Sequence, residues 1–192
     1  MCKVAVIQEA PILLDRDKTL ELAVSLVEQA AANGATLVVF PEAFVSGYPA
    51  WIWRLRPGGD WGTSESLHTR LVESAVDLEK DELAPLRSAA ARCKVTVVCG
   101  MNERDGRMSR TTVYNTVVVI DDDGEIKNRH RKLMPTNPER MVWGFGDGSG
   151  LQVVETPAGS VSDRKKPPSG RVATASGMYL SSAPSVASSR GA

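Results

Sequence analysis

The stretch LVVFPEAFVSGYPAW, residues 37–51, joins a short apolar run to a carboxylate and then to a loop rich in aromatic residues and glycine. Its first four residues have the composition of a buried β-strand. Pro41 ends this run, and Glu42 places a carboxylate at the strand's carboxyl end. In α/β sheets, ligand sites lie beyond the carboxyl ends of the strands. The stretch therefore predicts an α/β fold in which Glu42 stands at a site.

The segments before this stretch predict a βαβ-like unit. Residues 3–8 alternate and are β-branched, which favours a strand, and residues 35–40 form the strand that leads to Glu42. Between them, residues 17–33 have apolar residues at spacings of four, three and four, which is one face of a helix. Asp15 or Asp17 can cap the start of this helix, and Gly34 suits a left-handed stop. Strand, helix and strand joined by short links indicate an α/β fold.

Further elements are predicted up to residue 159. An apolar, Gly-, Pro- and Trp-rich loop covers residues 45–63, and two helices follow. Gly124 suits the turn of a hairpin because that position needs a positive φ. The later elements are a helix with Leu67, Leu71, Ala75 and Leu78 on one face, a helix within 81–94, a strand at 95–100, hairpin strands at 112–120 and 125–132, and a strand and turn within 151–159.

Composition indicates one globular domain and excludes several classes of partner. The chain has 192 residues, of which 42% are hydrophobic and 24% charged, as in an ordinary globular protein. Basic and acidic residues balance at 23 each, so no net field favours nucleic acid or an anionic membrane. No apolar run approaches the roughly 20 residues that span a bilayer. The three cysteines follow no metal or disulfide spacing, and a cytoplasmic protein without a metal site is expected.

The character of the sequence changes after residue 159. Residues 160–192 are dominated by Ser, Ala, Pro, Gly and basic residues, with hardly any apolar periodicity. Such a segment buries too little apolar surface to offset its ordering entropy. We therefore expect a folded domain over residues 1–159 and a disordered tail over residues 160–192.

Two charged residues fall at ends of predicted strands and suggest chemistry. Glu42 follows one strand, and Lys132 ends the RHRK cluster of the hairpin. A carboxylate and an ammonium that converge on one pocket suit a proton acceptor beside an electrostatic stabiliser. An ion pair that closes the edge of the sheet is the equally weighted alternative.

Several motifs resemble one enzyme family in order and spacing. FPEAFVSGYPAW, residues 40–51, and HRKLMPTNPERMVWGFGDGSG, residues 130–150, are similar to the nitrilase branch of the carbon–nitrogen hydrolase superfamily. VAVIQEAP, GATLVVFPE and YNTVVVIDDDGEI match as well. The resemblance covers residues 1 to about 159, and residues beyond do not match. It implies the N-terminal half to two-thirds of a nitrilase-like α-β-β-α sandwich.

The resemblance also implies roles for particular residues. Glu42 matches the family's general base, Lys132 the residue that stabilises developing negative charge, and Glu139 a second carboxylate that orients the lysine. Tyr48, Trp51 and Trp143 fall where they could line the substrate pocket, and packing of their segments on the body of the fold is the alternative. The implied substrate is a small organic nitrile, which a cysteine thiolate converts through covalent intermediates to a carboxylic acid and ammonia. No cofactor is implied, and relatives form homo-oligomers.

One departure from the family pattern bears on activity. The nucleophile of the family lies in a Cys-Trp-Glu motif expected soon after residue 159, but this chain has no cysteine after Cys99. Cys2, Cys93 and Cys99 do not stand where the motif requires. We therefore expect the chain as given to be inactive. The alternative to a nitrilase is a non-catalytic, truncated or frameshifted fragment that associates at most with full-length subunits.

Overall fold

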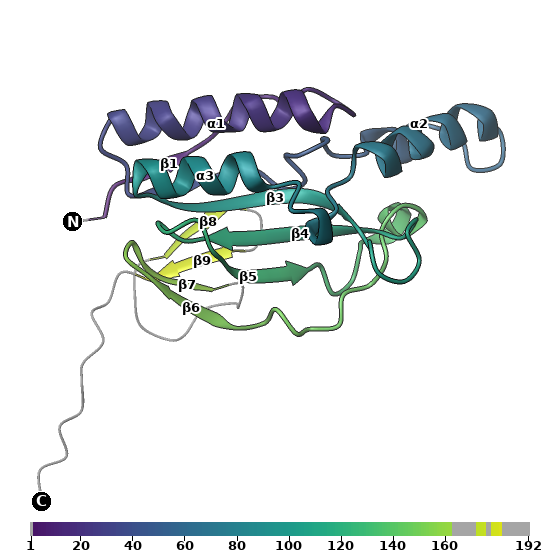
Figure 1. Ribbon diagram of the computed structural model, residues 1–192. Coiled ribbons are helices and arrows are strands. Elements are labelled where there is room, and N and C mark those ends of the chain that lie inside the picture. The colour runs from purple at the N-terminus through teal and green to yellow at the C-terminus, as the bar shows by residue number, and fades with distance from the viewer. Residues whose placement is uncertain (1, 163–171, 176–177, 182–192) are drawn as a thin grey trace, which may run out of the picture.

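The computed structural model describes residues 2–162, 172–175 and 178–181, and within them two sheets lie face to face. Helices α1 (Arg16–Ala32) and α3 (Ala84–Cys93) lie side by side over the outer face of the larger sheet, and the smaller sheet lies under its other face (Figure 1). The larger sheet has the order β1-β2-β3-β4-β5: Val4–Val6, Leu37–Val39, Thr96–Arg104, Val113–Ile120 and Ile126–Arg131. The smaller has the order β6-β7-β9-β8: Val153–Thr156, Gly159–Ser162, Met178–Ser181 and Val172–Ala175.

The larger sheet is parallel at one edge and antiparallel at the other. Strand β1 pairs with β2, and β2 with β3, in parallel, whereas β3, β4 and β5 pair antiparallel. The predicted βαβ unit is therefore confirmed. Helix α1 starts where Asp15 accepts a hydrogen bond from the backbone N–H of Lys18, which is one of the two predicted caps. Gly34 follows with φ +81°, as a left-handed stop requires.

Alternate residues of the strands serve two separate cores. Val38, Val97 and Cys99 belong to the core beneath α1 and α3. Leu37, Val39 and Val98 point to the other face, where Val154 and Val161 of the smaller sheet cover them. Successive side chains of a strand point to opposite faces, so a strand packed on both sides reads as a continuous apolar run. This arrangement confirms the predicted α/β class and an incomplete α-β-β-α sandwich.

Some predicted elements differ in extent. Helix α2 is Trp61–Ser74 and ends before Ala75, because Ala75 adopts an extended conformation and the chain then pairs with β3 through Val76 and Glu103. Strand β3 runs past residue 100 to Arg104, and its residues 97–104 pair with the whole of β4. Three short 3-10 helices are also present: η1 Ala50–Trp53, η2 Leu78–Lys80 and η3 Asn137–Met141. Helix η1 lies in the predicted loop, and Leu78, predicted to continue the preceding helix, begins η2 instead.

The expected disordered tail, residues 160–192, falls largely outside the described residues. Where the structure does describe this segment, its backbone forms β7, β8 and β9. For the remaining residues, disorder stays a prediction. None of the helices in the described part of the chain has the length and hydropathy needed to cross a membrane.

A close backbone approach fixes the turn that carries Glu42. A Cβ atom at Gly100 of β3 would lie 2.3 Å from the carbonyl oxygen of Pro41, 2.8 Å from the amide nitrogen of Ala43 and 2.9 Å from the Cα of Glu42. Only glycine leaves room for the turn at this position. The turn is held there by hydrogen bonds from Phe40 N to Val98 O, 2.9 Å, and from Val45 N to Gly100 O, 3.1 Å.

We predict that Gly100→Ala destabilises the fold by about 1–3 kcal/mol or more, because the added methyl group overpacks a backbone contact. Gly62→Ala is the matched control, since Gly62 lies in exposed α2 with no atom within 4 Å of an added Cβ. Alanine there should leave stability unchanged or raise it by up to about 1 kcal/mol. Urea unfolding of the two variants measures this, and equal stability of Gly100→Ala and the parent chain would contradict the account.

Candidate active site

The loop after Glu42 is held in an unusual backbone conformation. Ala43 and Ser46 both have positive φ, 50° and 75°, which is uncommon for residues other than glycine. The Ser46 hydroxyl donates to the carbonyl of Ser74, and the Asn102 amide donates to the carbonyls of Val45, 3.1 Å, and Gly47, 2.9 Å. Backbone strain of this kind persists only where surrounding contacts determine it, and it is concentrated at functional sites.

Lys132 is placed by the strand that precedes it. Its backbone N–H donates to the carbonyl of Asn115 on β4, 2.8 Å, just beyond the end of β5. The preceding residue, Arg131, is anchored by a carboxylate of β3, since its Nε donates to Glu103 Oε1 at 3.0 Å. Successive residues of an extended chain point to opposite faces, so the anchor of Arg131 directs Lys132 to the face of the smaller sheet.

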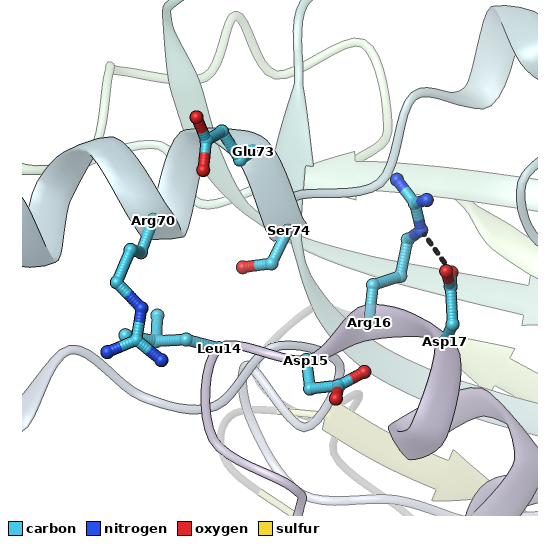
Figure 2. A pocket seen from close by; sticks show the side chains of 7 residues that line it. All are labelled: Leu14, Asp15, Arg16, Asp17, Arg70, Glu73 and Ser74. Carbon is cyan, nitrogen blue, oxygen red and sulfur yellow. Dashed lines mark hydrogen bonds and ion pairs between the residues drawn. The ribbon is translucent and has the colours of Figure 1, made fainter.

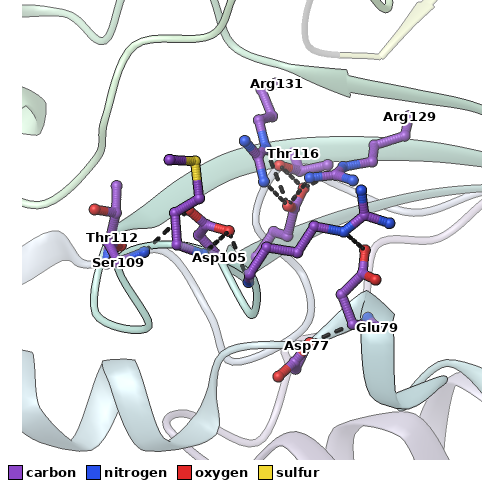
Figure 3. A network of polar contacts seen from close by, with 11 residues as sticks. Asp77, Glu79, Asp105, Ser109, Thr112, Thr116, Arg129 and Arg131 are labelled. Atoms are coloured by element: carbon purple, nitrogen blue, oxygen red, sulfur yellow. Dashed lines mark hydrogen bonds and ion pairs between the residues drawn. The ribbon is translucent and has the colours of Figure 1, made fainter.

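Glu103 is a buried carboxylate, with its side chain 1% exposed, and five donor groups from three residues satisfy it, including Nη2 of both Arg129 and Arg131. Arg129 Nε donates at 3.0 Å, Arg131 Nε at 3.0 Å, and the Thr116 hydroxyl at 2.8 Å. Figure 3 shows Thr116, Arg129 and Arg131 converging at this point. The Arg131 guanidinium also lies over the ring of Tyr114, 3.7 Å from its centre. Removal of one partner of a buried ion pair is strongly destabilising, so this network secures the β3–β4–β5 edge.

The structure brings Glu42, Lys132 and Glu139 together. The Lys132 ammonium lies 3.0 Å from Glu42 Oε1 and 2.9 Å from Glu139 Oε2. The side chains of Glu42 and Lys132 are each 31% exposed, whereas that of Glu139 is 6% exposed. One ammonium between two carboxylates leaves a net charge of about −1 when all three groups are ionised. The arrangement suits proton transfer at the accessible carboxylate, Glu42, with a cation directly beside it.

Glu139 is held by the start of η3. Its Oε2 accepts the backbone N–H of Thr136 at 2.6 Å, and the Thr136 side chain caps the same helix, which together form a capping box. The motif PTNPER, residues 135–140, encodes this geometry. Burial tends to raise the pKa of Glu139, but hydrogen bonds from Lys132, Thr136 and Tyr48 outweigh it and hold that pKa below its usual value. Glu139 is therefore a permanently anionic partner for Lys132 near neutral pH.

The same contacts shift the pKa of Lys132 in the opposite direction. Burial lowers its pKa, but hydrogen bonds with Glu139 and Glu42 outweigh burial and hold the pKa above its usual value. Lys132 thus carries its positive charge throughout the physiological range, as an electrostatic stabiliser must.

Asn115 is a site residue that the sequence analysis missed. Its side-chain amide donates to Glu42 Oε1 at 2.6 Å, and Asn115 is 6% exposed. Asn115 lies within the strand sequence VYNTVVVI, and asparagine is depleted from strands. An asparagine inside a β-branched run was therefore the signal that could have identified it.

Aromatic residues surround the charged cluster. The Tyr48 hydroxyl donates to Glu139 Oε1 at 2.7 Å, and the Tyr48 and Trp143 rings meet edge to face at 5.3 Å. Trp143 is 2% exposed, and its Nε1–H donates to Asn102, 2.9 Å. Trp51 packs against the apolar cluster that contains Trp143. The structure thus places Tyr48 against Glu139 and Trp143 beside Lys132, whose Nζ lies 5.6 Å from the centre of the Trp143 ring. Trp51 is placed only in the apolar surroundings of Trp143. Contact of the three predicted pocket residues with substrate stays a prediction.

The three cysteines differ in exposure. Cys2 is exposed and Cys93 partly buried, whereas Cys99 is buried within the core beneath the helices. Burial raises the pKa of the Cys99 thiol to about 12, so a thiolate there is strongly disfavoured at neutral pH.

A surface pocket of about 240 Å³ lies apart from the cluster, between the start of α1 and the end of α2 (Figure 2). It contains none of the predicted site residues; Leu14, Asp15, Arg16, Asp17, Arg70, Glu73 and Ser74 line it. Among the residues that the structure describes, no three His, Cys, Asp or Glu side chains are grouped as they would be around a metal ion.

Comparison with protein families identifies the chain. Residues 3–166 match the carbon-nitrogen hydrolase family. The chain belongs to this family. The match confirms the predicted resemblance and extends past the predicted boundary at residue 159 to residue 166.

Curated members of the family that resemble the chain carry nitrilase names. A nitrilase of Bacillus sp. (strain OxB-1) is 38% identical over 159 residues, which are 83% of this chain and 44% of the relative. A bifunctional nitrilase/nitrile hydratase, NIT4B, of Nicotiana tabacum is 40% identical over 83% of this chain and 45% of its own length. An arylacetonitrilase of Aspergillus niger is 40% identical with similar coverage. The carbon-nitrogen hydrolase chain thus spans less than half the length of these relatives.

Solved structures agree on the fold. Saccharomyces cerevisiae Nit3, a member of branch 10 of the nitrilase superfamily, superposes with a TM-score of 0.63 at 23% identity, covering 83% of this chain and 53% of Nit3. A carbon-nitrogen hydrolase from Helicobacter pylori gives a TM-score of 0.58 at 25% identity, over 81% of this chain and 48% of that one. The fold is therefore the N-terminal part of a nitrilase-like sandwich.

We predict that Glu139→Gln flattens the dependence of stability on pH in acid. The folded-state pKa of Glu139 lies below the usual 4.5, so its stabilising effect is fully present above about pH 4.5 and is lost as pH falls through the lower folded-state value. The loss of unfolding free energy between pH 7 and about pH 3 should be smaller in the variant. Denaturant melts at several pH values test this, with Glu65→Gln on exposed α2 as control. Parallel curves for Glu139→Gln and the parent would refute it.

Proposed function

We propose that this chain carries the proton-transfer and charge-stabilising half of a nitrile-hydrolysing site. The observation that carries the proposal is the Lys132 ammonium, 3.0 Å from Glu42 and 2.9 Å from Glu139. Glu42 acts as the general base, Lys132 stabilises the negative charge that develops on substrate, and Glu139 orients Lys132. Relatives named as nitrilases, 38–40% identical to the chain, support a small organic nitrile as the substrate class.

In the proposed reaction, Glu42 takes the proton of a cysteine thiol, and the thiolate attacks the nitrile carbon. The nitrogen that gains the electron pair takes this proton back from Glu42, which gives a thioimidate. Addition of water and loss of ammonia give a thioester, and a second water releases the carboxylic acid and restores the thiol. The developing charge on nitrogen, and later on oxygen, lies within reach of Lys132. The thiol is not supplied by this chain, because it has no cysteine after Cys99 and Cys99 is buried in the opposite core.

We therefore expect no turnover by the 192-residue chain alone. Ammonia release from aliphatic, aryl and arylacetonitriles measures this, and the expected rate equals the background without protein. Loss of a nucleophile costs several orders of magnitude in rate. Nitrile hydrolysis that disappears in Glu42→Gln would contradict the expectation.

The roles of Glu42 and Lys132 can be tested by restoring the rest of the sandwich. Residues 1–159 are joined to the C-terminal part of the Bacillus nitrilase, in place of that enzyme's own N-terminal part. The chimera should hydrolyse nitriles, and Glu42→Gln should lower its kcat by about 10²–10⁴-fold. Glu65→Gln is the matched control. A folded chimera whose activity survives Glu42→Gln would refute the proposed base.

A second candidate function follows from the coverage of the relatives. Because the chain spans 44–45% of their length and lacks the family nucleophile, it could act as a non-catalytic partner of full-length subunits. Co-expression with the tagged Bacillus nitrilase, followed by size-exclusion chromatography, shows whether the chain associates with that enzyme. Co-elution of the untagged chain supports association, and separate elution excludes it for that enzyme.

A further inference from the structure

Tyr48 has both hydrogen-bonding functions of its hydroxyl engaged by protein groups. The hydroxyl hydrogen goes to Glu139 Oε1 at 2.7 Å, and the hydroxyl oxygen accepts Trp53 Nε1–H at 3.0 Å. A phenol has a single hydrogen to donate. A substrate could therefore receive a hydrogen bond from Tyr48 only if Glu139 lost one.

The two oxygens of Glu139 are divided between different partners. Oε2 accepts from the Lys132 ammonium at 2.9 Å and from the Thr136 backbone N–H at 2.6 Å. Oε1 accepts from Tyr48, which comes from a segment 91 residues away in sequence. Because η1 packs against η3, the loop that carries Tyr48 and the helix that carries Glu139 are neighbours in the fold. The contacts at Oε2 fix the position of that oxygen alone. By holding Oε1, the Tyr48 hydroxyl also fixes the rotation of the Glu139 carboxylate about its bond to the side chain.

We propose that Tyr48 is a positioning residue for Glu139, and that its hydroxyl donates to Glu139 and not to substrate. Through the hydroxyl it keeps Glu139 Oε2 directed at Lys132, and through Trp53 its own hydroxyl is oriented toward Glu139. The edge-to-face contact of Tyr48 with Trp143, 5.3 Å between ring centres, holds the ring in place. This inference rests on the function proposed above. Its consequence is that the loop after Glu42, through Tyr48, positions the Lys132–Glu139 ion pair beside Glu42.

The electrostatics of the groups agree with this role. The pKa of Tyr48 is raised: burial, the largest cause, raises it, the hydrogen bond from Trp53 lowers it, and the contact with Glu139 raises it again. The phenol thus stays protonated and remains a donor. Its hydrogen bond is one of the three that lower the pKa of Glu139.

Tyr48→Phe tests the proposal without any substrate. The carboxyl carbon of Glu139 is followed by NMR during a pH titration of the 192-residue chain, and Glu139→Gln identifies the signal by its loss. Tyr48→Phe should shift the Glu139 titration to higher pH, because a donor to the ionised form is removed. Tyr114→Phe is the matched control, since the Tyr114 ring contacts Arg131 and not Glu139. This control should leave the titration in place.

The outcomes decide whether the Tyr48 hydroxyl positions Glu139. A shift of the Glu139 titration to higher pH in Tyr48→Phe, with no shift in Tyr114→Phe, supports positioning. Trp53→Phe, which removes the donor to the Tyr48 hydroxyl, should then give a smaller shift in the same direction. A Glu139 titration that is the same in Tyr48→Phe and the parent overturns the proposal. Thermal melting of each variant confirms that the compared proteins are folded. Because no nitrile enters the measurement, failure of the proposed reaction and failure of this inference are distinguishable.

Discussion

The Nζ atom of Lys132 is the point on which the charged site depends. It joins a carboxylate 90 residues away in sequence, Glu42, to one seven residues away, Glu139. Three separate structural features bring these side chains together. They are the turn packed on Gly100, the ion pair of Arg131 with Glu103, and the capping box of Thr136. Only the capping box is local in sequence, since Arg131 and Glu103 are 28 residues apart and Gly100 packs against the turn at Glu42. Together the three features set a charge cluster that is held before any substrate binds. Such preorganisation is the condition for electrostatic catalysis.

The alternation of the β-strands separates structural from chemical roles in this carbon-nitrogen hydrolase. One face of the larger sheet packs beneath α1 and α3, and Cys99 belongs there. Val117 and Val119 of β4 pack on the other face, and Asn115 has the same parity, so its contact with Glu42 lies on that side. The cysteine of β3 is thus separated from Glu42 and Asn115 by the sheet itself. A thiol that meets Glu42 must approach from the face toward the smaller sheet.

Local sequence patterns predicted most of the fold. The apolar run before Glu42, the helix face in residues 17–33 and the turn at Gly124 each depend on neighbouring residues, and they form as expected. Glu42, Lys132 and Glu139 were found from strand ends and from family motifs. Asn102, Glu103 and Asn115 were missed because their partners lie 13 to 73 residues away, and strand periodicity carries no information on such pairing. Each is a buried polar residue in a strand, which must find a partner and is therefore a sign of long-range contact.

The central claim is that the carboxylates of Glu42 and Glu139 stabilise the positive charge of Lys132 in this chain without substrate or partner. NMR titration of the Lys132 side chain, in the parent and in Glu42→Gln with Glu139→Gln combined, tests it most directly. The account predicts a Lys132 pKa above the ordinary 10.5 in the parent and a marked fall in the double variant. A parent pKa below 10.5, which burial without ion pairing would produce, would contradict it.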